Sequence, residues 1–308
     1  MANLATNPTS TPQFSIIIGA YNDWAALDSC LRSLQQQTNA PSFEVIVVDD
    51  GSADPAPDSI RAWCHHYPLV IVKQSHAGVS AARNRGTQIS KGPVLLFADA
   101  DSRFQMNCLE ALASTISNSP QHNSFQLRLT GDCSTLVGRI EALRLITLQD
   151  HLLQPDGCLR YLNTAGFAIR RTQVNIDAGV FYTGAVRGED TLLLAELIQH
   201  GQLPLLVTHA VVQHETPFSL LESIRKEIRS AYLEMNTYKI IDSKGVKFQV
   251  SHRERLKMLQ SMWKTSSRAS IGRLAWFVLV IRQALRLVVH FVYRAFGTRS
   301  HSQSSQSS

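Results

Sequence analysis

Several features that would place a chain in a common class are missing from this sequence. The five cysteines are scattered, odd in number and never spaced as C-x-x-C, which argues against a zinc site or a disulfide framework and favours reduced cytosolic thiols. Neither G-x-G-x-x-G nor G-x-x-x-x-G-K-[ST] occurs, which argues against a dinucleotide site and a P-loop. Residues 1–13 have neither the basic start nor the apolar centre of a signal peptide.

Acidic residues are scarce in the last third of the chain. Residues 221–308 hold 16 of the 30 Lys and Arg residues but five of the 24 Asp and Glu residues, and no acid follows Lys257. The first 220 residues carry a net negative balance. A basic C-terminal third favours an anionic partner, either nucleic acid or a membrane surface. Because no recognised nucleic-acid motif supports the first, we expect no nucleic acid partner.

The first hundred residues alternate between strand and helix patterns. Apolar and β-branched runs predict strands at residues 14–18, 43–48, 69–72 and 94–98, with helical patterns between them. This order predicts an α/β protein with a doubly wound, mostly parallel sheet flanked by helices. Beyond about residue 218 the pattern becomes helical, and we expect a helical C-terminal extension.

The most informative residues are Asp99 and Asp101, which directly follow the strand predicted at residues 94–98. Open α/β sheets bind their ligands at the carboxyl ends of strands. Two acids so placed repel each other unless a cation lies between them or one stays protonated. A divalent metal with oxygen ligands, Mg²⁺ or Mn²⁺, resolves this conflict and commonly brings a phosphate with it. A solvated pair of loop acids is the alternative, since Asp-x-Asp alone is a weak signal.

Two other predicted strands are also followed by residues whose side chains could bind a ligand. Tyr21 follows the first strand, where an aromatic ring can stack on a flat base, although an ordinary turn tyrosine fits the same pattern. Asp50 follows the second strand and can accept the N3–H of uracil or thymine, a group that cytosine lacks. The alternative for Asp50 is a common Asp-Gly turn.

Taken together, these segments resemble the family 2 glycosyltransferases, which have the GT-A fold. The order, spacing and identities match over residues 14–101, in the segments 14–22, 30–38, 43–54, 78–86 and 95–101. The resemblance thins through residues 104–160, returns near residues 164–220 and says little about the rest. One departure is Gly19-Ala20, which stands where the family often has Pro-Thr or Pro-Ser.

The resemblance implies roles on the donor side of a transfer reaction. Tyr21 would lie against the base of the donor nucleotide, and Asp50 would bond its N3–H. Asp99 would hold the ribose and the surroundings of the metal, while Asp101 would coordinate the Mg²⁺ or Mn²⁺ that bridges the diphosphate. Ala20 would contribute to nucleotide-sugar binding mostly through its backbone.

Further roles are implied for residues of the helix starts and for a histidine. Arg83 would contact the base or a phosphate, although a position on the helix surface fits as well. Asp190, in a segment like the family's Glu-Asp motif, would be the general base, with Glu189 as the alternate and helix capping as the simpler interpretation. His214 would complete the metal's shell or meet the diphosphate, with His209 as its competitor.

The C-terminal helical region carries basic residues at every fourth position: Arg282, Arg286, His290 and Arg294. On a helix these form one stripe beside a broad apolar face. The arginines interrupt any long uncharged run, so a membrane-crossing helix is not expected. Two interpretations stay open: an interfacial helix lying on anionic lipid, or a helix packed on the catalytic domain with a solvated Arg stripe.

These observations predict an inverting, metal-dependent glycosyltransferase that uses a nucleoside diphosphate sugar, UDP-linked on the Asp50 argument, with a guanine nucleotide as the open alternative. The acceptor would be a hydroxyl of a glycan or lipid-linked sugar, as in the synthesis of cell-envelope or extracellular polysaccharide. A non-catalytic nucleotide-sugar-binding protein on the same fold is the alternative. A nucleotidyltransferase is a third hypothesis, disfavoured because no Gly-rich basic loop follows the first strand.

The expected organisation has four parts: a disordered N-terminus at 1–13, a GT-A catalytic domain at 14–220, a basic helical extension at 221–300 and a disordered tail at 301–308. Within the catalytic domain we expect a nucleotide-binding half at 14–103 and an acceptor half at 104–220. The sequence also predicts a cytoplasmic protein, peripheral on the inner face of the membrane if the basic extension binds lipid.

Overall fold

The computed structural model describes residues 11–185, 187–216, 219–243, 252–268 and 270–296. The chain divides into two compact units. The first contains residues up to 130 together with 152–184 and 189–215, and the second contains 131–151, 185–188 and everything from 216 onward. The second unit, which is helical, therefore includes residues 131–151 from the middle of the chain. The disordered segments predicted at 1–13 and 301–308 lie outside the described residues, apart from residues 11–13.

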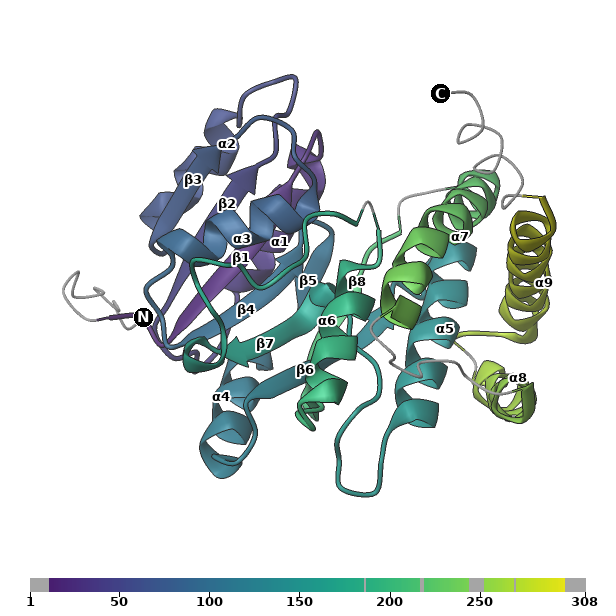
Figure 1. Cartoon of the computed structure of the whole chain (residues 1–308). Helices are drawn as coiled ribbons and strands as arrows, with labels where there is room; N and C mark the ends of the chain where they lie inside the picture. Colours follow the sequence, from purple (N-terminus) through teal and green to yellow (C-terminus); the bar gives the residue numbers. More distant parts are fainter. Residues whose placement is uncertain (1–10, 186, 217–218, 244–251, 269, 297–308) are drawn as a thin grey trace. The chain divides into compact units, whose positions relative to one another are not determined.

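The first unit is built on a mixed sheet, in which the described residues form eight strands in the order β3-β2-β1-β4-β7-β6-β8-β5 (Figure 1). The first four strands pair in parallel, as predicted: β1 (Phe14–Ala20), β2 (Phe43–Asp49), β3 (Leu69–Lys73) and β4 (Val94–Asp99). Antiparallel pairs join β4 to β7 (Phe167–Arg170), β7 to β6 (Ser124–Gly131), and β5 (Ser102–Phe104) to β8 (Leu205–His214).

The apolar runs of the parallel strands explain this arrangement. Residues 16–18, 45–48 and 95–98 are completely buried, as expected for parallel strands that are covered on both faces. Helix α3 (Val79–Ile89) packs on β1 and β2, and α4 (Cys108–Asn118) packs on β8. The unit also contains α1 (Trp24–Gln35), α2 (Asp58–Arg61), α6 (Glu189–Gln199) and the 3₁₀ turns η1 (Ala62–His65), η2 (Thr164–Gly166) and η3 (Arg171–Gln173).

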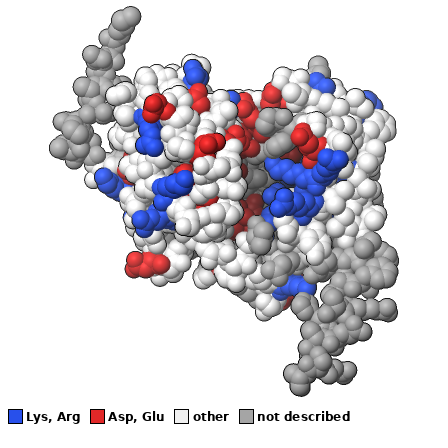
Figure 2. All heavy atoms as spheres, turned by 90° about the horizontal axis from the view of Figure 1, so that it is seen from above, with Lys and Arg blue, Asp and Glu red and all other residues white. Residues whose placement is uncertain are grey.

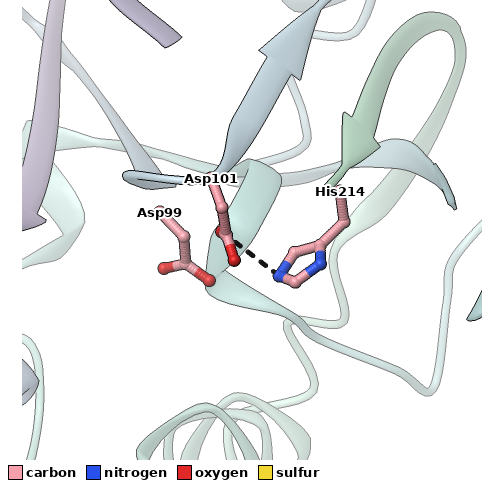
Figure 3. Close-up of side chains that lie close together, drawn as sticks. All are labelled: Asp99, Asp101 and His214. Carbon is pink, nitrogen blue, oxygen red and sulfur yellow. Dashed lines mark ion pairs between the residues drawn. The ribbon is translucent and has the colours of Figure 1, made fainter. Parts of the chain in front are cut away.

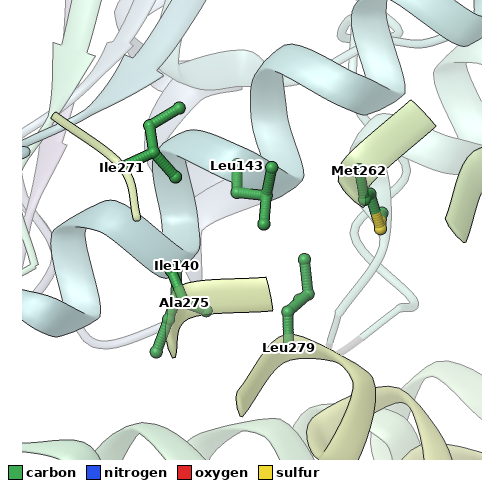
Figure 4. Close-up of a cluster of buried hydrophobic side chains, with 6 residues drawn as sticks. All are labelled: Ile140, Leu143, Met262, Ile271, Ala275 and Leu279. Atoms are coloured by element: carbon green, nitrogen blue, oxygen red, sulfur yellow. The ribbon is translucent and has the colours of Figure 1, made fainter. Parts of the chain in front are cut away.

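The second unit is helical, with α5 (Leu136–Leu152), α7 (Leu220–Ser243), α8 (His252–Ser266) and α9 (Arg273–Phe296). Its buried core joins α5 to α8, α9 and the turn between them; Figure 4 shows the six residues Ile140, Leu143, Met262, Ile271, Ala275 and Leu279. Gly272, with a φ of +77°, makes the turn from α8 into α9. None of the described helices is both long enough and apolar enough to cross a membrane.

An ionic cluster joins α9 to α7. Arg282 Nη2 lies 2.5 Å from Glu227 Oε2, and Arg286 Nη1 lies 3.0 Å from Glu227 Oε1. Arg286 also bonds Glu234. Burial opposes the ionisation of Glu227, but Arg282 and Arg286 outweigh it and lower the pKa of this carboxyl. Arg282 and Arg286 therefore do not form the solvated or lipid-facing basic stripe that helical spacing suggested, because they are paired with glutamates of α7. The side chains of His290 and Arg294, the other two members of that stripe, are outside the described residues.

Charge is unevenly spread over the surface. On the face that Figure 2 displays, Lys and Arg side chains form one larger group on the right of the view, whereas on the left they are interspersed with Asp and Glu. The cysteines are free, and burial raises the pKa of the Cys30 and Cys108 thiols, which makes both poor nucleophiles.

Candidate active site

Asp50 anchors the loop between β3 and α3. Its Oδ1 accepts hydrogen bonds from Gln74 Nε2 at 2.8 Å and from the Ala77 amide at 2.9 Å. Its Oδ2 accepts from the Gly78 amide at 2.9 Å and lies 2.9 Å from His76 Nδ1. Since each carboxylate oxygen accepts about two hydrogen bonds, these four contacts occupy the group. A bond from the N3–H of a base would have to displace one of these donors or share its oxygen.

Tyr21 stands beside this loop at the carboxyl end of β1. Its side chain is 50% exposed, and its ring centroid lies 4.4 Å from that of His76 with the planes inclined at 30°. Ala20 is buried, and its carbonyl oxygen accepts from the Asp50 amide at 2.9 Å, which ties the ends of β1 and β2 together. The pair Tyr21 and His76 therefore presents flat ring surface at the edge of the sheet, next to Asp50.

Asp99, Asp101 and His214 form a second group, drawn in Figure 3. Each offers a ligand atom within 4.8 Å of the other two, and His214 Nε2 lies 3.3 Å from Asp101 Oδ1. Asp99 ends β4, Asp101 follows in the turn to β5, and His214 ends β8. The register of β5 with β8 places Ser102 opposite His214 and so brings the histidine to the acids. His209, the alternative histidine, is exposed and belongs to no such group among the described residues.

The donor set of this group fits a divalent cation. Two carboxylate oxygens and one imidazole nitrogen suit Mn²⁺, and a mainly oxygen shell completed by phosphate and water suits Mg²⁺. The three side chains are partly exposed, so a diphosphate and water could reach the open positions. His214 Nδ1 is buried and has no hydrogen-bond partner in the described part of the chain.

Arg83 links this group to the start of α6. Its guanidinium donates from Nη2 to Asp99 Oδ1 at 2.6 Å and from Nη1 to Glu189 Oε1 at 2.7 Å, and its side chain is 3% exposed. It also lies over the ring of Phe181, 5.4 Å from the centroid. Burial alone would lower the pKa of Arg83, but Asp99 and Glu189 raise it above its ordinary value. Arg83 is therefore no helix-surface residue, and both terminal nitrogens bind carboxylates.

Glu189 and Asp190 open α6, and they face different partners. Glu189 is held by Arg83, whereas Asp190 Oδ1 accepts from the Thr191 amide at 2.7 Å and from Thr191 Oγ1 at 3.2 Å. Burial, and then the neighbouring charge of Glu189, raise the pKa of Asp190 to about 7. A carboxyl with a pKa near 7 is suited to accept a proton at neutral pH.

Some residues of this region were not predicted from the sequence. His76 and Gln74 belong to the polar stretch after β3, which ends at the same edge of the sheet as β2, and that shared edge is the signal that could have pointed to them. Asn84 binds the segment around Phe181, accepting from the Val180 and Phe181 amides at 2.9 Å each. No local pattern links Asn84 to a residue 97 positions away.

The mixed sheet, with four parallel strands and acidic residues at the ends of two of them, is the architecture expected of a GT-A fold. Solved structures agree. A mannosyltransferase from Pyrobaculum calidifontis, PcManGT in complex with GDP-Man and Mn²⁺, superposes with a TM-score of 0.61 and 16% identity over 96% of this chain and 90% of that one. S. aureus TarS residues 1–349 in complex with UDP gives a TM-score of 0.55 and 16% identity over 92% and 91%.

The chain belongs to glycosyl transferase family 2, whose family model matches residues 15–177. A relative from Escherichia coli K12, the uncharacterized glycosyltransferase YibD, is 26% identical over 197 residues, which is 61% of this chain and 57% of the relative. The alignment thus spans a little over half of that relative's length. Both the family and the GT-A fold predicted from the sequence are confirmed.

Proposed function

We propose that this protein is an inverting, metal-dependent glycosyltransferase that transfers a sugar from a nucleoside diphosphate sugar to a hydroxyl acceptor. The observation that carries the proposal is the convergence of Asp99, Asp101 and His214 at one edge of the sheet. Arg83 connects this group to Glu189, next to Asp190. Groups suited to hold a diphosphate and a carboxylate suited to take a proton thus come together.

In the proposed reaction the acceptor oxygen attacks the anomeric carbon from the face opposite the diphosphate. A new carbon–oxygen bond forms, the bond to the diphosphate breaks with its electron pair, and Asp190 takes the hydroxyl proton. Its raised pKa, about 7, matches this task. A Mg²⁺ or Mn²⁺ bound by Asp101, Asp99 and His214 would stabilise the charge that develops on the leaving group. The attack from the opposite face inverts the configuration.

The donor half is proposed to bind the nucleotide through Tyr21 and Asp50. Tyr21 offers an exposed ring for stacking on the base, and the Ala20 backbone lies next to it. A uracil base is favoured, since its N3–H can bond Asp50 if a loop donor yields its place. Related folds support a nucleotide sugar in general, because TarS was solved with UDP and with UDP-GlcNAc, and PcManGT with GDP-Man.

The acceptor is proposed to be a glycan or lipid-linked sugar of cell-envelope or extracellular polysaccharide, reached from the cytoplasmic side of a membrane. The basic C-terminal third supports this location, since anionic lipid attracts such a region. A panel of soluble and lipid-linked acceptors with one donor tests the point. Transfer to lipid-linked acceptors alone would support it, and transfer confined to a small soluble hydroxyl compound would overturn it.

The central test is Asp101→Ala, with Asp177→Ala as control, because Asp177 is an exposed acid of the same unit outside the metal-ligand group. Thermal shifts with UDP and GDP, with and without Mn²⁺, would measure donor binding, and product formation would measure transfer. We expect Asp101→Ala to lose the Mn²⁺-dependent shift and at least about a hundredfold of the rate, while Asp177→Ala behaves like wild type. Normal transfer by Asp101→Ala would refute the metal site. Nucleotide binding by wild type without turnover on any substrate would instead favour the non-catalytic binding protein.

A further inference from the structure

Helix α9 presents an apolar stripe to solvent. Leu274, Phe277, Ile281, Ala284 and Val288 recur at alternating intervals of three and four residues, so they share one helical face. All five are exposed, and the four larger side chains have exposed fractions of 54–61%. At about 1.5 Å per residue the stripe is about 21 Å long. A continuous exposed apolar surface of this length marks an interaction site more often than chance exposure.

The opposite side of α9 is fixed within the helical unit. Ala275 and Leu279 are buried in its core, and Arg282 is buried against Glu227 of α7. Arg286 bonds both Glu227 and Glu234 of the same helix. These contacts set the rotation of α9 about its axis. The apolar stripe therefore faces outward as a consequence of packing, and the paired arginines are not available to a ligand.

Aromatic residues gather at the N-terminal end of the stripe. The ring centroids of Trp263 and Trp276 lie 4.8 Å apart, and Phe277 lies 5.1 Å from Trp276. Arg273 lies over the Trp263 ring, 4.1 Å from its centroid. Tryptophan with a neighbouring basic side chain suits the boundary between hydrocarbon and water, where one part of the group is apolar and the other is hydrated.

The charged side chains of residues 257–273, the segment that leads into the stripe, are all basic, and the glutamates that contact α9, Glu227 and Glu234, are paired with its arginines. Lys257, Lys264, Arg268 and Arg273 are all exposed, and the sequence contains no Asp or Glu after Glu254. Two copies of such a face would bring like charges together, whereas an anionic lipid surface complements them. We propose that the stripe on α9 docks on the surface of an anionic lipid bilayer, with its apolar side chains inserted to a shallow depth and the four basic residues at the headgroups.

Vesicle flotation of the full chain tests the proposal, using phosphatidylcholine vesicles and vesicles of equal parts phosphatidylcholine and phosphatidylglycerol. Wild type should float with the anionic vesicles at low salt. Phe277→Gln with Ile281→Gln should lower the partition coefficient about tenfold or more for each side chain. Met106→Gln is the matched control, since Met106 is 62% exposed in the other unit and should leave binding unchanged.

A separate double variant tests the contribution of the basic residues to binding of anionic vesicles. Lys264→Gln with Arg268→Gln should lower binding to anionic vesicles about fivefold for each residue at low salt, and the difference should shrink at high salt. Circular dichroism should match wild type, and the melting temperature should change by only about a few degrees. All four substituted side chains are exposed, and Phe277 loses a ring contact with Trp276.

Three results would overturn the proposal: no flotation of wild type at low salt, equal flotation with both kinds of vesicle, or a wild-type dimer in solution that Phe277→Gln with Ile281→Gln dissociates. The last would assign the stripe to a second copy of the chain. None of these readouts depends on sugar transfer, so they are independent of the proposed reaction.

Discussion

Replacing Arg83 by methionine should destabilise the protein and disturb the reacting groups together. Arg83 is 3% exposed and holds Asp99 at 2.6 Å and Glu189 at 2.7 Å. Methionine has similar length and no charge, so the two carboxylates would face each other without compensation. Removing one partner of a buried ion pair costs about 3–5 kcal/mol. For a domain of this size that corresponds to a fall in melting temperature of roughly 6–20 °C.

The kinetic consequence separates two roles for Arg83. A residue that holds Asp99 and Glu189 in place should affect kcat, and should affect nucleotide affinity only when Mn²⁺ is present, because Asp99 is a proposed metal ligand. A residue that contacts base or phosphate should lower nucleotide affinity without metal as well. Arg83→Lys keeps a positive charge but cannot bond both carboxylates through a planar group. We expect Arg83→Lys to lower kcat about tenfold or more, with the Kd for UDP measured without metal changing only a few fold.

Calorimetry for UDP and steady-state rates on the same samples make this measurement. The double variant Glu189→Gln with Arg83→Met should be more stable than Arg83→Met alone, because it removes one of the two carboxylates that the single variant leaves unpaired. If Arg83→Lys loses nucleotide affinity while stability and kcat hold, the positioning role is refuted and the direct contact expected from the family resemblance is supported.

Two more predictions follow from the shifted carboxyl groups. For Asp190, the rate kcat/KM should rise with pH to a plateau above about pH 7, and Asp190→Asn should lose about a hundredfold or more of the rate. Because the pKa of Asp190 is raised in the folded state, the stability contributed by this group is present below its ordinary pKa of 3.8 and is lost as pH rises through about 7. Asp190→Asn should therefore melt at a higher temperature than wild type at pH 8 and at a similar temperature at pH 3.5. Equal melting temperatures at pH 8 would contradict the pKa shift. For Glu227, whose pKa is lowered from 4.5, the contribution is present above pH 4.5 and is lost in more acidic solution. Glu227→Gln should lower the free energy of unfolding in urea at pH 7 by about 3–5 kcal/mol and should reduce the further loss of stability on acidification. The control Asp242→Asn, at an exposed acid of the same helix, should change neither quantity.

The donor half of the fold was predictable because its signals are local. Each parallel strand contains a run of consecutive apolar residues, broken only near its start by Ser15 in β1 and Glu44 in β2. The residues of interest stand at or just beyond the carboxyl end, as with Asp99 and Asp50. Neighbouring strand ends share an edge, so proximity could be inferred without coordinates. His214 could be proposed for the same reason, from its place after a β-branched run. The roles assigned to these residues stay predictions until ligand binding is measured.

The remainder depends on contacts between distant residues. Arg83 and Glu189 are 106 positions apart, and nothing in the pattern around either one indicates the other. The strand β5 has three residues, too few for a recognisable alternation, so its antiparallel pairing with β8 was not predicted. On α9 the sequence showed a basic stripe and an apolar stripe, but which of them faces outward is decided by Glu227 and Glu234 on another helix.

The short ladder between β5 and β8 has a consequence for assembly of the protein. Asp101 and His214 are separated by more than a hundred residues, and the last residue of β8 is the one that reaches the acids. A chain emerging during synthesis could complete its four parallel strands well before that histidine is made. In the proposed metal site, tight binding would then begin only when β8 has taken its place between β6 and β5, so affinity for Mn²⁺ would report how far folding has progressed.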